Sequence, residues 1–402
     1  MLWRYLAGAA AARTADEMSG PALLIAGLAV TGSPVVASWL LAGLTVSAAA
    51  GGPLLGVLLD RARRPGRLLA GCVVAYAGEL LVIVSGLGRV PEAALVAVAV
   101  AAGVVGPALT GGWTAQLPSV TAPARQDRAS ALDAMTYNVA GLAGPALAGV
   151  IAGGPAAVLV CVGLLAAALP AAWTLPAVRT PPAPVRARRG IGEELREGFG
   201  AILGNPALLR ATAGSMVSCA GTAMLVVSAP VLGARLTGST GPGALLLAVT
   251  AACGLAANAL VARARGPRRW DALLVRGTAV AGAGMALAAA AASASASQAT
   301  SATSGAAVSW AYWVAVVAAG VVGLGEGPQL TALFSVRHRE APARLRAQVF
   351  TTGASLKITS FAVGSAVAGP LAAYSVAAAL LAGAAAQAVA VAVLTAGRPR
   401  SA

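Results

Sequence analysis

The sequence predicts an all-α integral membrane protein with twelve transmembrane helices in two six-helix halves. Three observations predict this class. Of the 402 residues, 58% are hydrophobic and only 10% are charged, and apolar stretches long enough to cross a bilayer recur along the chain. A soluble protein carries about a quarter of its residues as charged ones. The composition therefore excludes a soluble enzyme, a disordered chain and a disulfide scaffold.

The apolar stretches number twelve, each about 20 residues or longer. Several are rich in Ala and Gly, so each is only weakly hydrophobic by itself. The four cysteines lie inside these stretches without metal-ligand spacing, and the single histidine, His338, lies in a basic segment that we expect to be a solvated loop. We therefore expect no metal and no cofactor. The predicted spans are 4–30, 35–59, 67–88, 92–115, 129–153, 155–177, 207–233, 241–264, 271–292, 307–333, 347–370 and 373–396.

The basic residues divide unequally between the two sides of the membrane. Of 28 lysines and arginines, 23 lie in the segments that are cytoplasmic if the N-terminus is inside, and two lie in external loops. Because positive loops stay in the cytoplasm during insertion, we expect a multi-pass protein of the cytoplasmic membrane with both termini inside. A net charge of +15 could indicate nucleic-acid binding, but these residues are spread over short loops, so we expect no nucleic-acid partner.

Two parts of the chain repeat each other weakly. The segment 106–110, Gly-Pro-Ala-Leu-Thr, recurs at 327–331 as Gly-Pro-Gln-Leu-Thr, and Ala-Pro-Ala-Arg at 122–125 recurs at 341–344. The near-constant offset places six spans in each half. We therefore predict an N-terminal half over 1–177, a cytoplasmic linker over 178–206 and a C-terminal half over 207–402.

The linker has two readings that the sequence leaves open. It begins with the Pro-rich stretch 181–184 and an arginine cluster at 186–189, and then Ile191, Leu195, Phe199 and Ile202 follow at three- and four-residue steps. That spacing indicates a short amphipathic helix on the inner membrane surface. A solvated linker is the alternative.

The loop after the second span carries the most specific motif. It reads Gly56-Val57-Leu58-Leu59-Asp60-Arg61-Ala62-Arg63-Arg64-Pro65-Gly66-Arg67. This resembles the cytoplasmic signature of the major facilitator superfamily, in which Asp and Arg follow a Gly by four and five residues, and a Gly and a basic residue come next. The gap from Arg61 to Gly66 is longer than is usual in that family. The alternative is a basic loop that only sets topology.

The resemblance implies that Gly56, Asp60, Arg61, Gly66 and Arg67 form a conformational lock at the cytoplasmic ends of the helices. Asp60 would pair with Arg61 or with a helix end from the other half. The counterpart in the second half has Ala262 in the place of the Asp, so only the first lock is complete.

The fifth span resembles a Gly-Pro motif found in exporters of this superfamily. Its residues are Gly141, Gly144, Pro145 and Gly149, with Ala148 where the family has a further Gly. A proline on a face of small residues kinks a helix and lets a neighbour pack closely. The fourth span, 92–115, lacks the arginine that the family associates with proton coupling. The resemblance is to bacterial drug or siderophore exporters.

Ionisable residues inside spans are costly and mark candidate functional sites. Arg13, Asp16 and Glu17 in the first span share one helix face by their spacing. Arg13 can pair with either carboxylate and leave the other able to take up a proton. A purely structural ion pair at the cytoplasmic end is the alternative.

Further candidates lie in four other spans. Glu79 and Glu326 are candidate coupling groups, and Glu326 stands in the stretch 323–328, which we expect to bend or unwind because it is rich in Gly and contains Pro. Lys357 either contacts substrate or neutralises Glu326. Tyr137 and Asn138 are candidate cavity residues, and we expect the neighbouring Asp133 at the cytoplasmic start of its span.

These features predict a secondary active transporter that moves a small molecule by alternating access, with proton-coupled efflux as the leading interpretation. Proton-coupled uptake and a transport-inactive membrane sensor are the alternatives. The sequence has no phosphate-binding Gly-x-x-x-x-Gly-Lys motif, and one histidine offers no catalytic set, so we expect no enzyme. The expected partners are a small-molecule substrate, protons and the lipid bilayer, and we expect a monomer.

Overall fold

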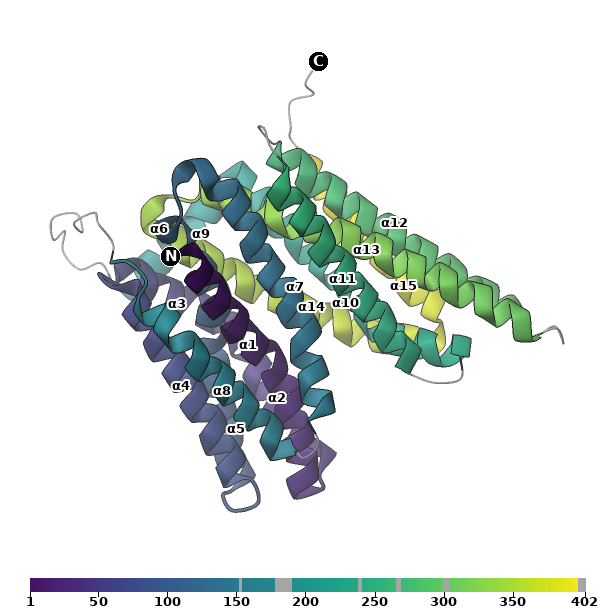
Figure 1. Cartoon of the computed structure of the whole chain (residues 1–402), viewed down its shortest axis with the longest axis horizontal. Coiled ribbons are helices and arrows are strands. Elements are labelled where there is room, and N and C mark those ends of the chain that lie inside the picture. The colour runs from purple at the N-terminus through teal and green to yellow at the C-terminus, as the bar shows by residue number, and fades with distance from the viewer. Residues whose placement is uncertain (152–153, 178–189, 238–240, 265–268, 299–303, 397–402) are drawn as a thin grey trace. The chain divides into compact units, whose positions relative to one another are not determined.

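The computed structural model shows a chain built from helices (Figure 1). It describes residues 1–151, 154–177, 190–237, 241–264, 269–298 and 304–396, and no strand occurs among them. The long helices are α1 Leu2–Thr31, α2 Pro34–Val46, α3 Ala48–Arg61, α4 Pro65–Gly86, α5 Glu92–Pro107, α7 Gln126–Val150, α8 Gly154–Trp173, α9 Ile191–Gly204, α10 Pro206–Thr237, α11 Gly241–Arg263, α12 Trp270–Gln298, α13 Ser304–Glu340, α14 Arg346–Tyr374 and α15 Val376–Thr395. The short elements are η1 Ala108–Gly112, α6 Leu117–Val120, η2 Pro123–Arg125 and η3 Ala343–Leu345.

Each predicted span is helical over most of its described residues, so the all-helical class is confirmed. Among the described residues, ten helical stretches are long and apolar enough to cross a membrane. Helices α1 and α7 are not among these ten. Helix α1 carries Arg13, Asp16 and Glu17 in its middle portion, and α7 carries Asp127, Arg128 and Asp133 in its first third. The count of twelve crossings therefore stays a prediction.

The chain divides into two compact units. The first comprises Met1–Pro206 together with Arg337–Thr359, and the second comprises Ala207–Val336 together with Ser360–Ala402. The segment Arg337–Thr359, which the sequence assigns to the C-terminal half, thus belongs to the first unit. The Pro-rich stretch 181–184, the arginine cluster at 186–189 and the basic residues of 265–268 lie outside the described residues.

The helices of the first unit pack closely through glycines. Helix α1 lies against α7 and α8, while α2 and α3 lie against α5. A Cβ added to Gly51 would lie 2.1 Å from the carbonyl oxygen of Val104, and one added to Gly103 would lie 2.1 Å from that of Leu44. In a bilayer, where lipid offers no hydrophobic drive between helices, such backbone approach is a main source of attraction.

Two predicted spans of the first unit are not single regular helices. The span 35–59 is divided at Ser47, whose hydroxyl donates to the carbonyl of Gly43 at 2.8 Å. The span 92–115 changes after Pro107 to the wider helical turn η1. A proline lacks the N–H that continues a regular ladder, and wide turns of this kind are frequent at functional sites.

The second unit has a core of small and branched apolar side chains from α10, α11, α12, α13 and α15. Leu225, Leu246, Met285, Val322 and Leu380 are each at most 3% exposed. This core positions the polar face of α13, which carries Glu326.

The repeat in the sequence is also a repeat in local structure. The matched segments 122–125 and 341–344 both fold into a short tight turn, η2 or η3, that leads directly into a long helix, α7 or α14. The two matched segments therefore begin equivalent helices.

Helix α13 corrects two expectations. It runs without interruption from Ser304 to Glu340, so the stretch 323–328 is not unwound, and its glycines serve close packing instead: a Cβ on Gly327 would lie 2.3 Å from the carbonyl oxygen of Gly254. The helix also includes His338. That residue is 8% exposed and packs on the ring of Phe350 at a centroid distance of 4.5 Å, so it is not a solvated loop residue.

Candidate functional site

A buried ion pair joins α1 to α7. Arg13 Nη1 lies 2.9 Å from Asp133 Oδ1, and both side chains are at most 1% exposed. The sequence predicted Asp16 or Glu17 as the partner of Arg13 and placed Asp133 at the cytoplasmic start of its span. The first expectation was wrong, because the packing of α7 on α1 brings Asp133 to the guanidinium from 120 residues away. Asp133 does lie near the start of α7, which begins at Gln126, and its place relative to the membrane stays a prediction.

Four neutral side chains surround this pair, and three of them form hydrogen bonds with it. Tyr5 donates to Asp133 Oδ1 at 2.9 Å, and Thr114 donates to Oδ2 at 3.0 Å. The guanidinium of Arg13 donates to Thr114 at 2.7 Å and to the hydroxyl of Thr136. Tyr137 contributes its ring, which lies 3.9 Å from Arg13 Cζ, and its hydroxyl, which lies 3.1 Å from that of Thr114. Only the Nε of Arg13 has no acceptor among the described residues. Loss of either charge would leave the other buried and uncompensated, which is costly.

The carboxylates of α1 are left outside this network. Asp16 Oδ1 accepts a hydrogen bond from the Tyr76 hydroxyl at 3.2 Å, and Tyr76 in turn lies 2.8 Å from the hydroxyl of Ser19. Glu17 makes no hydrogen bond or ion pair with the described residues, and the charged group that attracts it electrostatically is Lys357. Arg13 therefore does not hold Asp16 or Glu17 in the charged state.

The Gly-Pro motif of α7 packs against α1 beside Glu17. A Cβ on Gly144 would lie 2.8 Å from the Cβ of Glu17 and 2.9 Å from the backbone nitrogen of Met18. Gly141 and Gly149 have nothing within 4 Å of such a Cβ. Pro145 lies inside α7. Within the motif, Gly144 is thus the residue that lets α7 approach α1.

Asp60, at the end of α3, caps the start of α14. Its two carboxylate oxygens accept hydrogen bonds from the backbone N–H groups of Ala347 and Gln348, each at 2.9 Å. Gly56 allows the close approach, because a Cβ there would lie 2.3 Å from Gln348 Cα. A carboxylate at a helix N-terminus satisfies free N–H groups and the helix dipole together.

The other motif residues hold neighbouring helices. Arg61 donates to Glu194 of α9 at 2.6 Å. A Cβ on Gly66 would lie 2.4 Å from the carbonyl oxygen of Ala172 in α8, and the guanidinium of Arg67 lies 5.3 Å from the ring of Trp173. The five residues are thus at three helix contacts within the first unit.

The described part of the linker, α9, takes part in the same contacts. Glu197 pairs with Arg344 at 2.5 Å, and the side-chain amide of Gln348 donates to the carbonyls of Glu194 and Leu195 at 3.1 and 3.2 Å. The expected amphipathic helix is present from Ile191 to Gly204. It lies against the ends of α3 and α14 as well as exposing apolar residues such as Leu203, which is 63% exposed.

The second unit has its own polar cluster around α13. Glu326 Oε1 accepts a hydrogen bond from Thr222 of α10 at 2.6 Å. One turn further on, the Gln329 amide donates to Ser218 and to Thr278, both at 2.8 Å. Buried Gln387 of α15 accepts from Ser218 at 2.7 Å. Four helices thus meet through polar side chains beside Glu326.

The remaining predicted residues form fewer hydrogen bonds and ion pairs with the described residues. Glu79 of α4 is half-buried, and its Oε2 has no hydrogen-bond partner among the described residues. The same holds for the Nδ2 of Asn138. Lys357 belongs to the first unit and Glu326 to the second, so the suggested pairing of these two residues stays a prediction.

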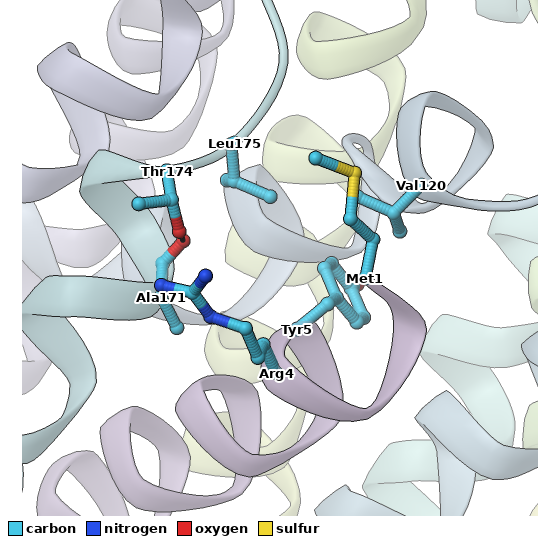
Figure 2. A pocket seen from close by; sticks show the side chains of 7 residues that line it. All are labelled: Met1, Arg4, Tyr5, Val120, Ala171, Thr174 and Leu175. Carbon is cyan, nitrogen blue, oxygen red and sulfur yellow. Dashed lines mark hydrogen bonds between the residues drawn. The ribbon is translucent and has the colours of Figure 1, made fainter.

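Figure 2 shows a pocket at the N-terminal end of α1. It contains none of the predicted coupling or cavity residues, although Tyr5 also belongs to the Arg13 network. We therefore leave it outside the site. Its lining residues are Met1, Arg4, Tyr5, Val120, Ala171, Thr174 and Leu175.

Sequence reasoning missed Thr114, Tyr76 and Gln387 as members of these clusters. Each is a polar residue in an otherwise apolar span. Isolated hydroxyl and amide groups inside spans were a usable signal, because a polar group in a membrane helix needs a partner on a neighbouring helix.

Solved structures of other proteins show the same fold. The fold is that of a membrane transporter: human organic anion transporter MFSD10 (TETRAN) superposes with a TM-score of 0.72 at 15% identity, covering 98% of both chains. A bacterial homologue of the iron transporter ferroportin gives 0.72 at 17% identity over 98% of both. The proton:xylose symporter XylE gives 0.68 at 13% identity, over 97% of this chain and 94% of the other. At these identities the likeness concerns the fold alone.

The chain belongs to the major facilitator superfamily, whose family model matches residues 5–356. A curated relative, the uncharacterized MFS-type transporter y4rN of Sinorhizobium fredii (strain NBRC 101917 / NGR234), is 29% identical over 211 residues, which are 52% of this chain and 51% of that protein. The match thus spans about half the length of the relative. The family resemblance predicted from the loop at 56–67 is confirmed.

Proposed function

We propose that the chain is a secondary active transporter that exports a small molecule from the cell by alternating access, in exchange for protons. Membership of a transporter family supports the transport itself. The observation that carries proton coupling is the engagement of Arg13 by Asp133. Because this arginine is neutralised by another residue, the α1 carboxylates Asp16 and Glu17 remain able to bind and release protons.

Asp16 and Glu17 have different environments. The Tyr76 hydroxyl donates to the ionised form of Asp16, so protonation of Asp16 changes a contact between α1 and α4. Glu17 faces the attraction of Lys357 in α14, so its protonation changes an interaction between α1 and α14. Each proton is thereby linked to a helix contact, which is what coupling to a conformational change requires.

The neighbouring polar groups supply candidate substrate contacts. Tyr137 and Asn138 follow Asp133 on α7, and the Nδ2 group of Asn138 is a buried donor without a partner among the described residues. On the second unit, Glu326 is a further candidate for coupling or substrate contact. Glu79 is assigned a lesser part, since no described hydrogen bond or ion pair links it to the other candidates.

The contacts of Asp60, Arg61 and α9 serve in this proposal as the conformational lock. They hold the start of α14 on the first unit through backbone hydrogen bonds and exposed ion pairs. Such contacts can break and re-form at small cost, as a lock that opens once in each transport cycle must.

The proposal is tested with the purified full-length chain in liposomes that contain a pH-sensitive dye. A panel of anionic, cationic and neutral solutes is added in the presence of an imposed pH gradient. We expect at least one solute to drive proton flux opposite to its own movement. Solute movement in the same direction as protons would favour the uptake symporter, and no driven or downhill movement of any solute would favour the sensor.

Variants assign the coupling residues. We expect Asp16→Asn and Glu17→Gln to abolish uphill transport while downhill exchange of the same solute continues. Glu92→Gln is the matched control, because Glu92 is an exposed carboxylate at the start of α5. Uphill transport that survives both α1 substitutions would remove these residues from the mechanism.

The proposed orientation places both termini in the cytoplasm. In a cysteine-free background, cysteines introduced at Arg89 and Arg63 are expected to react with an impermeant maleimide from opposite sides of the cytoplasmic membrane. Reaction of both from the same side would reject this topology.

A further inference from the structure

Arg337, near the end of α13, is a buried guanidinium without an acidic partner among the described residues. It is 2% exposed, and it forms no ion pair with any residue that the structure describes. Two of its nitrogens, Nε and Nη2, have no hydrogen-bond acceptor in the same described part of the chain. A buried charge is normally paired or hydrogen-bonded, because leaving water otherwise carries a large cost.

The surroundings of Arg337 hold the guanidinium in place but do not neutralise it. Its Cζ lies 6.0 Å from the centre of the Phe350 ring. A Cβ on Gly353 would lie 2.4 Å from the same Cζ. The guanidinium plane of Arg337 therefore rests against the backbone of α14 at a position that only glycine leaves open. The negative end of the α13 dipole favours a cation here, but it offers no acceptor to Nε or Nη2.

The charged groups near Arg337 add to its positive character. His338 is the next residue, and both of its ring nitrogens are buried without a partner among the described residues. Arg346, at the start of α14, interacts electrostatically with His338 and with Asp60. Asp60 is the nearby acid, and both of its oxygens already accept from Ala347 and Gln348. Within the described part of the chain, no free anion therefore faces Arg337.

The two free nitrogens define the shape of the missing group. Nε–H and one Nη–H of a guanidinium form a planar fork that binds two oxygens of one carboxylate or phosphate. Arg337 also interacts electrostatically with Tyr137, a candidate cavity residue whose neighbour Asn138 has its own unpartnered buried donor. The fork is therefore linked electrostatically to a residue that the proposed function assigns to the substrate contacts.

We propose that Arg337 binds the anionic group, a carboxylate or a phosphate-type oxyanion, of the molecule that this protein transports. This inference rests on the proposed function for the identity of the occupant. The existence of an anion site at Arg337 rests on the contacts of Arg337 alone.

The test uses the full-length chain in dodecyl maltoside micelles and two matched probes, benzoate and benzamide, which differ in charge and share their ring. Inorganic phosphate is a third probe. Binding is followed by the shift of the thermal unfolding midpoint with probe concentration. We expect saturable binding of benzoate and phosphate, and none of benzamide.

Substitutions locate the binding. We expect Arg337→Gln to weaken benzoate binding about tenfold or more, as loss of a charge-assisted hydrogen-bond pair predicts. Arg337→Lys keeps the charge but lacks the fork and is expected to weaken it less. Gly353→Ala introduces a methyl group against the guanidinium and is also expected to weaken benzoate binding. It serves as the second test if Arg337→Gln does not fold. Arg339→Gln, at an exposed arginine one residue beyond His338, is the control that should leave binding unchanged.

A second arm separates the two sources of such an anion. Benzoate binding is repeated in nanodiscs of phosphatidylcholine alone and in nanodiscs that contain phosphatidylglycerol. We expect the same affinity in both. Competition by phosphatidylglycerol would overturn the assignment to the transported molecule, because the occupant would then be a lipid headgroup.

No saturable benzoate or phosphate binding, or binding that Arg337→Gln and Gly353→Ala leave unchanged, would overturn the anion site itself. Failure of the proposed function is a separate result, since absence of proton-driven flux in liposomes with benzoate binding intact would reject coupling and leave the anion site standing.

Discussion

Two buried arginines of the first unit, Arg13 and Arg337, differ in what neutralises them. Arg13 has a carboxylate at 2.9 Å and hydroxyl partners from two helices. Arg337 has an aromatic ring and a glycine backbone beside it, and no acid among the described residues. The described residues therefore supply a carboxylate partner for one buried charge and none for the other. The first arrangement fixes α1 on α7, and the second provides a place for an anion from outside the protein.

The Arg13–Asp133 pair offers the largest expected effect on stability. Asp133→Ala leaves a buried guanidinium without its carboxylate, and we expect a loss of about 3–5 kcal/mol. The measurement is the unfolding midpoint in detergent, with Asp127→Ala as the control, because Asp127 is exposed in the first turn of the same helix. An equal loss in the two variants would contradict the assigned pairing.

Removal of both charges of the Arg13–Asp133 pair tests whether the two residues interact. The double variant Arg13→Met with Asp133→Leu replaces the pair by apolar side chains of similar size, and such replacements are often neutral or stabilising. We expect it to be more stable than either single variant. A double variant as unstable as the sum of the two singles would show that the residues act independently.

Asp60 tests a carboxylate whose hydrogen bonds come from backbone N–H groups and not from an arginine. We expect Asp60→Ala to cost about 0.5–2 kcal/mol, the usual range for loss of a helix cap. Hydrogen exchange should show faster exchange of the amides of Ala347 and Gln348. Unchanged exchange at these two amides would contradict the cap.

The smallest effect is expected at the exposed pair of Arg61 and Glu194. The two side chains are 37% and 25% exposed, and such pairs contribute about 0–1 kcal/mol. We expect Glu194→Gln to change the unfolding midpoint only slightly, and less at high salt because salt screens exposed charges. A loss of stability as large as that of Asp133→Ala would mean that the contribution of an ion pair to stability does not depend on its burial.

The membrane fold could be predicted from the sequence because its signals are local. Long apolar runs predicted the long helices other than α9, and the segments 122–125 and 341–344 showed a repeat that reappears as two equivalent tight turns. The division at Ser47 was not predictable in this way, because the apolar run continues across it. The continuity of α13 through Pro328 was missed because Gly and Pro were read as helix breakers, whereas its glycines serve close helix packing.

The sequence could predict which residues belong to the candidate site, but not how those residues pair. Arg13, Asp16 and Glu17 were found because charges in spans are rare, but the partner of Arg13 depends on the packing of α7 against α1. Spacing along one helix shows which residues share a face, and it does not show what the neighbouring helix presents. Arg337 was counted with a basic loop, since nothing in its immediate sequence indicates that α13 extends to Glu340 and buries it.

The most direct test of the difference between the two arginines compares Arg13→Met with Arg337→Met by their unfolding midpoints in the absence of added anions. Arg13→Met leaves Asp133 uncompensated and is expected to lose about 3–5 kcal/mol. Arg337→Met removes a buried charge whose transfer out of water costs several kcal/mol. It also removes a stabilisation of about 0.5–2 kcal/mol from the contact with Phe350 and of about 0.3–1 kcal/mol from the helix dipole. We predict that Arg337→Met is more stable than the parent protein. A loss of stability as large as that of Arg13→Met would contradict the account, because Arg337 would then have a partner within the chain.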